Sequence, residues 1–146
     1  SMSRVSAFKE DAKSTDFGRN LLEMNLDATM IFAGRKRLFL SMMDYGLKSY
    51  LNGISMVNPK IAFKFWTLFQ KKDQRQVEEF ISIVDDPFWD NLVSKYGWHR
   101  VNKASLQYFG FMDRFDRMPM AHLNKEEYLI LKKFWDQHQS IIDQWV

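Results

Sequence analysis

A single lysine, Lys9, stands near the end of the apolar run that opens this chain, residues 4–11. Small and bulky apolar residues alternate before it and charged residues follow, a pattern that predicts a buried strand opening into a loop. Burial disfavours the ammonium form, so it lowers the pKa of a lysine and supplies a neutral amine that attacks carbonyl carbons. The alternative, which is the commoner case for such a pattern, is a lysine that is simply solvated at a strand end.

The elements that must position this lysine alternate along the first third of the chain. Residues 14–16 offer N-cap side chains for a short amphipathic helix, and Gly34 ends a β-rich apolar run. This alternation of strand and helix predicts parallel strands joined by right-handed crossovers. The predicted order is strand 4–11, helix 14–24, strand 29–33, helix 38–43 closed by residues 45–46, and strand 48–55.

The residues after the third predicted strand are predicted to form helices, several of which have identifiable ends. Pro59 suits the first turn of one helix and Asp73 suits the N-cap of the next. Pro87 starts or kinks a third helical segment, and Asn124 with Glu127 three residues later predicts a capping box for the last helix. Breaks are predicted at residues 96–97, at Gly110 and over a loop, residues 111–123, that Pro119 stiffens.

Residues 8–11, Phe-Lys-Glu-Asp, resemble the Schiff-base strand of the dihydrodipicolinate synthase and N-acetylneuraminate lyase family. These proteins are class I aldolases and dehydratases built on a (β/α)8 barrel, with the lysine on the sixth strand. Residues 96–100 are more similar to the branch that contains sugar-acid dehydratases than to the lysine-biosynthesis branch. Further segments extend the resemblance over nearly the whole chain in matching order and spacing: residues 28–34, 46–59, 102–110 and 117–123.

The resemblance implies an α/β fold: a partial (β/α)8 TIM barrel, with strands equivalent to six to eight, followed by C-terminal helices. Residues 1–58 would carry the Schiff-base lysine strand, and residues 59–146 would form the last barrel helix and the C-terminal helical segment. A complete barrel needs about 250 residues, and this chain has 146. The expected partner is therefore a missing N-terminal barrel half or, for a natural truncation, a second copy in a homo-oligomer.

The resemblance also assigns roles at the carboxyl ends of the strands, where barrel sites lie. Lys9 would form an imine with a 2-keto acid, such as pyruvate or a keto-deoxy sugar acid, without a metal or organic cofactor. The backbone near Gly34, the Leu51 carbonyl and Gly53 would face that substrate. Asp11 follows on the same side of an extended chain. It departs from the family, which often has a substrate-contacting hydroxyl residue there.

Arg35 and Lys36 directly follow Gly34, where the lysine-biosynthesis members carry acidic residues. Two cations suit the distal carboxylate of a sugar acid, and a solvated helix start is the alternative. The family's carboxylate-binding Thr-Thr-Gly-type loop and proton-shuttling tyrosine belong to earlier strands, and no stretch here resembles either. Two functions stay open: the C-terminal portion of a Schiff-base aldolase or dehydratase, expected to be inactive alone, and a non-catalytic relative that acts as an assembly domain.

The composition indicates which cellular compartment and which kinds of partner suit this chain. With 46% hydrophobic and 27% charged residues the chain is globular. A net charge of +3 and one short basic run, residues 35–37, do not indicate nucleic-acid binding. No apolar run reaches membrane-spanning length, and the lack of cysteine fits a reducing, cytoplasmic compartment. The three histidines show no metal-ligand spacing, and Trp98 beside His99 and Arg100 predicts core packing at a helix start.

Overall fold

A computed structural model of the chain describes residues 5–11 and 14–146. The chain divides into two compact units, Ser1–Gly53 and Ile54–Val146, called here the sheet unit and the helical unit. Within the described ranges, no helix is both long enough and apolar enough to cross a bilayer.

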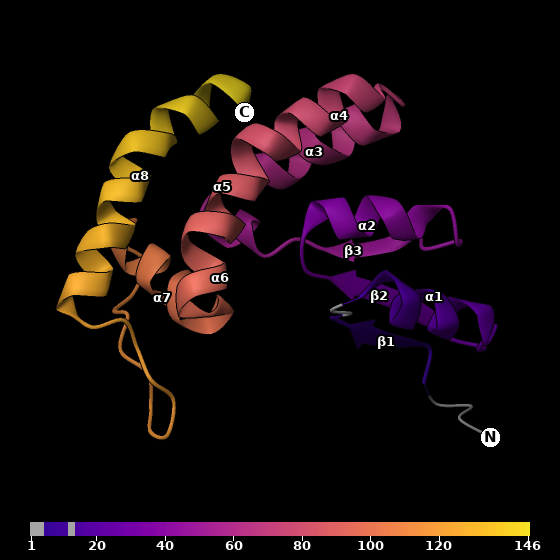
Figure 1. Ribbon diagram of the computed structural model, residues 1–146, viewed down its shortest axis with the longest axis horizontal. Coiled ribbons are helices and arrows are strands. Elements are labelled where there is room, and N and C mark those ends of the chain that lie inside the picture. The colour runs from indigo at the N-terminus through magenta and orange to yellow at the C-terminus, as the bar shows by residue number, and fades with distance from the viewer. Residues whose placement is uncertain (1–4, 12–13) are drawn as a thin grey trace. The chain divides into compact units, whose positions relative to one another are not determined.

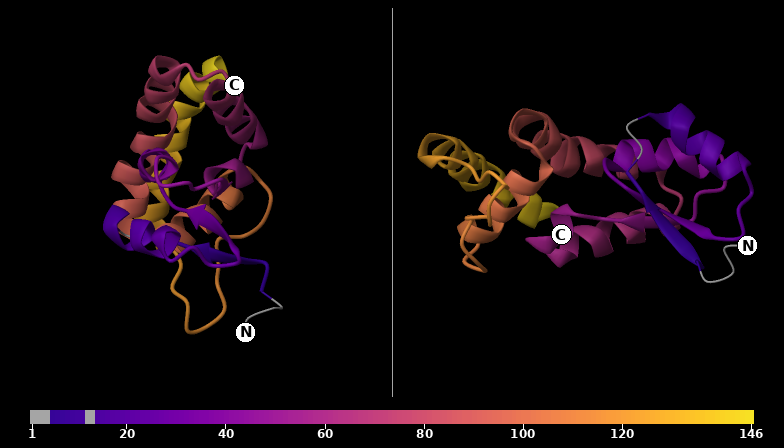
Figure 2. Two further views of the ribbon diagram at one scale, coloured as in Figure 1. Left: turned by 90° about the vertical axis from the view of Figure 1, so that its right-hand side faces the viewer. Right: turned by 90° about the horizontal axis from the view of Figure 1, so that it is seen from below.

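The sheet unit holds three parallel strands in the order β1-β2-β3, which confirms the predicted parallel arrangement. Its two helices pack side by side on one face of the sheet (Figure 1 and Figure 2). The third strand is shorter than predicted, because the chain forms a 3-10 turn from Ile54 onward. The elements are β1 (Ala7–Glu10), α1 (Thr15–Glu23), β2 (Thr29–Ala33), α2 (Lys36–Met43) and β3 (Ser49–Leu51).

The register of the sheet decides which way Lys9 points. Phe32 pairs with Tyr50, and the Tyr50 ring stacks on Phe39 of α2 with centroids 4.6 Å apart. The side chains of Phe32 and Tyr50, which form one row across the strands, therefore face the helices. Lys9 pairs with Ile31 in the next row along, and successive residues of a strand point to opposite faces. Lys9 thus lies on the face that α1 and α2 leave uncovered.

One prediction about this sheet is wrong. The lysine strand is not buried: Ala7 and Lys9 are exposed, because within the described residues β1 is an edge strand paired with β2 alone. Arg4, its predicted first residue, lies outside the described residues. Either Tyr50 or Leu51 was expected on the inward face with Val5 and Ala7. Strand alternation sends the Tyr50 ring to the α2 side and leaves Leu51 on the inward face.

The helical unit is held by capped helices around an aromatic core. The predicted caps are confirmed at Asp73, whose carboxylate accepts the Gln76 N–H at 3.0 Å, and at Asn124, which forms the capping box with Glu127. α3 packs beside α4, and α7 beside α8 (Figure 1). The elements are η1 (Ile54–Met56), α3 (Pro59–Gln70), α4 (Gln74–Phe80), η2 (Ile81–Asp85), α5 (Asp86–Phe88), η3 (Trp89–Val93), α6 (Ser94–Tyr96), α7 (Trp98–Tyr108) and α8 (Lys125–Trp145).

Pro87 lies inside a helical run rather than at its start. It belongs to α5, and the π-helical turns η2 and η3 flank it. Proline has no N–H to donate and its ring crowds the carbonyl four residues earlier, so a wider turn relieves both conflicts. The run ends at Gly97, whose φ of 85° confirms the predicted break.

Trp135 lies at the centre of the helical unit. Its side chain is 1% exposed, and its indole N–H donates to the Ser105 hydroxyl at 3.0 Å. The Phe88 and Phe109 rings approach it at 5.7 and 5.1 Å. The hydrogen bond satisfies the one polar atom of the ring, so Trp135 is buried among apolar side chains without an unpaired donor.

Candidate functional site

The carboxyl end of the sheet brings together residues from two strands. Lys9 Nζ on β1 lies 4.0 Å from Asp11 Oδ2, and the two side chains are 53% and 64% exposed. Alternation places both on the uncovered face, as predicted. The burial that the sequence predicted around the amine is not provided by the described residues of this unit.

Gly34, directly after β2, completes this group. Its φ of 120° is a backbone conformation that residues with a side chain rarely adopt. A Cβ added there would lie 3.2 Å from Asp11 Oδ1. The Asp11 carboxylate therefore reaches from the Lys9 amine to the Gly34 backbone, and the absence of a side chain at residue 34 makes room for it.

Tyr50 holds the same glycine from the other side. Its hydroxyl donates to the Gly34 carbonyl at 2.7 Å. The sequence did not predict this contact, because it left open whether Tyr50 or Leu51 faces the barrel interior. The usable signal was the two-residue alternation, which separates Tyr50 from Leu51. Leu51 itself is 54% exposed on the Lys9 face, and Gly53 is half-buried.

The two cations after Gly34 have different surroundings. Lys36 is fully buried at the start of α2, and its Nζ donates to Asn52 Oδ1 at 3.3 Å. A solvated helix start is therefore wrong for Lys36. Arg35 is half-buried at the N-cap position of α2. The bond from Lys36 ties the start of α2 to the residue that follows β3.

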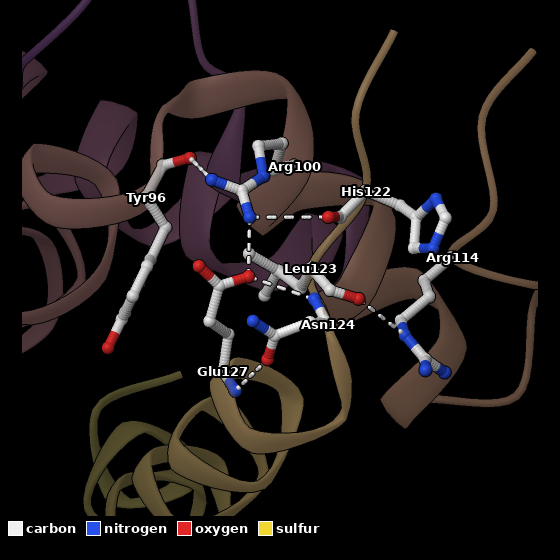
Figure 3. Close-up of polar contacts among 7 residues, drawn as sticks. All are labelled: Tyr96, Arg100, Arg114, His122, Leu123, Asn124 and Glu127. Atoms are coloured by element: carbon white, nitrogen blue, oxygen red, sulfur yellow. Dashed lines mark hydrogen bonds and ion pairs between the residues drawn. The ribbon is translucent and has the colours of Figure 1, made fainter. Parts of the chain in front are cut away.

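Arg100, beside Trp98 and His99 at the start of α7, joins neighbouring elements to one another. Its guanidinium donates to the Tyr96 and His122 carbonyls, at 3.4 and 3.2 Å, and pairs with the Glu127 carboxylate (Figure 3). The Asn124 N–H lowers the pKa of Glu127 most, and Arg100 lowers it further. These bonds tie α7, α8 and the loop between them into one clamp.

Two of the three histidines make ring contacts, and His99 is exposed. The His138 ring stacks on Phe134 with centroids 4.1 Å apart, and its Nδ1 lies 2.9 Å from the Phe134 carbonyl. The His122 ring meets Phe115 edge-on at 4.8 Å. Among the residues that the structure describes, no three His, Asp or Glu side chains gather as a metal site.

Comparison with known proteins agrees with this architecture. Residues 1–138 match the model of the dihydrodipicolinate synthetase family. No curated protein matches the sequence. The chain resembles the 4-hydroxy-tetrahydrodipicolinate synthase of Methylacidiphilum fumariolicum SolV with a TM-score of 0.77 and 17% identity, covering 97% of this chain and 47% of that one.

Two further solved structures are similar. N-acetylneuraminate lyase from Mycoplasma synoviae gives a TM-score of 0.68 and 20% identity, covering 90% of this chain and 44% of that one. YagE, an E. coli K12 prophage protein of the dihydrodipicolinic acid synthase family solved with pyruvate, gives 0.70 and 14%, covering 94% and 47%. The chain thus spans about half the length of these relatives, 44–47% of each. Its three-stranded parallel sheet and helices have a partial TIM-barrel-like arrangement, and the chain belongs to the dihydrodipicolinate synthetase family.

Proposed function

We propose that this chain is the C-terminal portion of a Schiff-base lyase, an aldolase or dehydratase, that acts on a 2-keto acid. One observation carries the proposal: Lys9, Asp11 and Gly34 converge at the carboxyl end of a parallel sheet. Lys9 also lies on the face that the helices leave open. In (β/α)8 barrels that face lines the interior, and catalytic residues stand at that end of the strands.

In this proposal β1, β2 and β3 are the sixth, seventh and eighth strands of the barrel. Residues 1–58 supply the barrel part and residues 59–146 supply the last barrel helix and C-terminal helices. The other strands come from an N-terminal barrel half, which would also bury Lys9. A cytoplasmic location fits the absence of cysteine.

The substrate class follows from the family and from the residues near the lysine. The relative that was solved with pyruvate supports a 2-keto acid. The Leu51 carbonyl and the backbone at Gly34 and Gly53 would face it, and Arg35 would receive the distal carboxylate of a keto-deoxy sugar acid. Replacing Arg35 by alanine would then raise KM for a dicarboxylic substrate about ten-fold or more, because a charge-assisted contact contributes about 1.5–3 kcal/mol. KM for pyruvate would stay unchanged, and equal effects on both would reject the role of Arg35.

Reductive trapping tests the nucleophile. Incubation with pyruvate and borohydride should add a stable secondary amine to the peptide that contains Lys9, detected by mass spectrometry. Lys9→Ala should lose this adduct, whereas Lys48→Ala, which removes an exposed lysine ahead of β3, should keep it. An adduct that survives Lys9→Ala, or none on the wild-type chain joined by its N-terminal half, would rule out the mechanism.

The open sheet favours a second candidate function, an assembly domain without catalysis. Among the described residues β1 and β3 each have one neighbouring strand, and Val5 and Leu51 are 43% and 54% exposed. Unpaired strand edges and exposed apolar side chains favour association with another chain. The chain made alone should therefore sediment as a dimer or larger species at micromolar concentration. A monodisperse, cooperatively melting monomer would exclude this role.

A further inference from the structure

We propose that Asp11 is a catalytic residue, which accepts the proton of the Lys9 ammonium and returns it to the departing oxygen of the substrate. The inference rests on the proposed function, because it needs Lys9 as the nucleophile. It assigns to Asp11 a proton transfer that the family resemblance places on a tyrosine outside this chain.

Geometry singles out Asp11 among its neighbours. Asp11 Oδ2 lies 4.0 Å from Lys9 Nζ, a distance that one side-chain rotation or one bridging water closes to a hydrogen bond. Glu10 stands between them in the chain, but it pairs with Phe32 in the row that faces the helices. The strand therefore presents one carboxylate to the amine and turns the adjacent one away.

The second oxygen of Asp11 connects this pair to the place where the substrate would lie. Asp11 Oδ1 lies 3.2 Å from the position of a Cβ at Gly34. The Tyr50 hydroxyl, which donates to the Gly34 carbonyl at 2.7 Å, fixes that backbone. A 2-keto acid bound against Gly34 then has the Lys9 amine and the Asp11 carboxylate on the same side of its carbonyl.

The chemistry balances without any outside reagent. The Asp11 carboxylate takes a proton from the Lys9 ammonium, and the neutral amine adds to the keto carbon. A proton moves from this nitrogen to the new alkoxide, which gives a carbinolamine. The Asp11 carboxyl then donates its proton to the hydroxyl, the C–O bond breaks, and water leaves. The nitrogen lone pair forms the C=N bond of the protonated imine, and Asp11 is again a carboxylate.

If Asp11 formed only an ion pair with Lys9, its effect on the rate of imine formation would be the opposite. The proposal can therefore be tested. A carboxylate that only neutralises the ammonium favours the charged form and makes the amine less available. Removing such a carboxylate would speed imine formation, whereas removing a proton carrier would slow it. In the described chain both side chains are more than half exposed, so the ion pair by itself contributes little to stability.

The experiment measures the initial rate of pyruvate trapping at Lys9 by cyanoborohydride at neutral pH, using the chain joined by its N-terminal half. Asp11→Asn should slow trapping about ten-fold or more, within the usual range for general acid–base catalysis. Asp11→Glu should recover part of the rate. Glu10→Gln is the matched control and should leave the rate unchanged, and circular dichroism melting checks that each variant is folded.

The outcomes separate the two proposals. Trapping that is equal or faster in Asp11→Asn, with the adduct still on Lys9, overturns the role of Asp11 and leaves the nucleophile standing. Equal slowing by Glu10→Gln also overturns it, because a general loss of negative charge then explains the rate. No adduct on wild-type Lys9 overturns the proposed function itself.

Discussion

The two units of this chain use their polar side chains in different ways. In the helical unit Arg100 pairs with Glu127, and Ser105 accepts from Trp135, so each group joins one helix to another. In the sheet unit Lys9 and Asp11 lie more than half exposed on an uncovered face. Polar groups that are already engaged in such contacts stabilise a fold, and groups left accessible at strand ends are available for chemistry.

Two glycines with positive φ, one in each unit, show the same contrast. Gly34 has φ 120° and the Asp11 carboxylate beside it, whereas Gly110, which ends α7, has φ 78° and open space around it. The first glycine makes room for the Asp11 carboxylate, and the second only turns the chain. Substitutions in each unit should therefore affect different properties, and the following predictions begin with the largest effect.

Replacing Trp135 by alanine should cause the largest loss of stability. The change empties the centre of the helical unit, where Trp135 is 1% exposed, and leaves the buried Ser105 hydroxyl without its donor. The expected loss is about 3–5 kcal/mol, measured as a shift in urea denaturation. Trp66→Ala is the control, since Trp66 is 41% exposed on α3. Similar losses in the two variants would contradict the aromatic core.

Gly34→Ala should come next and should combine backbone strain with a steric conflict. The new Cβ meets Asp11 Oδ1 at 3.2 Å, and φ 120° disfavours any side chain. The expected cost is about 1–3 kcal/mol, because strained backbone conformations cost that much. Gly110→Ala, with no atom within 4 Å, carries backbone strain alone and should cost less.

A double mutant isolates the steric part of that cost. Because the conflict at residue 34 is with a single carboxylate, adding Asp11→Ala should recover part of the stability lost in Gly34→Ala. The same addition to Gly110→Ala should recover none. Strict additivity of Asp11→Ala with Gly34→Ala would mean that the two residues do not touch.

Sequence patterns predicted the ends of elements well because local chemistry determines them. Ser14, Asp73 and Asn124 each accept the N–H three residues onward, as their types and positions predicted. The parallel order of the strands also followed from their alternation with helices. Lys9 and Asp11 were placed together by simple alternation along a strand.

Burial and orientation were predicted less well, because they depend on contacts between distant residues. Lys36 is buried because its amine reaches Asn52, sixteen residues along the chain, which no local pattern reveals. The exposure of Lys9 reflects its place on an edge strand, and a hydrophobic run cannot distinguish an edge from a centre. The Tyr50 contact with Gly34 needed the register of two strands.

The clamp around Glu127 predicts an acid-sensitive helical unit. The Asn124 N–H, and then Arg100, hold the pKa of Glu127 below its ordinary value. A lowered folded pKa means that this stabilisation is present above the unfolded pKa and is lost as pH falls through the folded value. Glu127→Gln keeps an oxygen for the Asn124 N–H but removes the charge that pairs with Arg100, so it should lower Tm at neutral pH by a few degrees. Its Tm should also fall less than that of the wild type between neutral and acid pH.

Glu126→Gln provides the matched control for this acid effect. Glu126 lies in the same first turn of α8, but it is exposed. It should keep the wild-type dependence of Tm on pH, measured by circular dichroism. An equal flattening in both variants would show that net charge, rather than the Arg100 clamp, causes the acid response.

Tyr108 should produce the smallest effect, confined to alkaline pH. Burial, followed by its hydrogen bond to Asp136, raises the pKa of Tyr108 to about 12. The hydroxyl donates to Asp136 Oδ1 at 2.8 Å, and Lys132 pairs with the other oxygen of that carboxylate at 3.3 Å. Because the folded pKa is raised above the unfolded value of about 10, this contribution to stability is complete below pH ~10. It is lost as pH rises through about 12.

The phenolate absorbance, titrated as the difference between wild type and Tyr108→Phe, measures this pKa directly. Asp136→Asn removes the charge but keeps the burial, so it should lower the Tyr108 pKa without returning it to the ordinary value of about 10. Asp143→Asn removes a carboxylate elsewhere on α8 and should leave the titration unchanged. The effect of Asp136→Asn on stability at neutral pH should be small, because its hydrogen bond with Tyr108 is exposed to solvent. If Asp136→Asn alone restored the ordinary pKa, the carboxylate and not burial would dominate. The surroundings of Tyr108 and Asp136 would then be as accessible to water as the face of the sheet that carries Lys9.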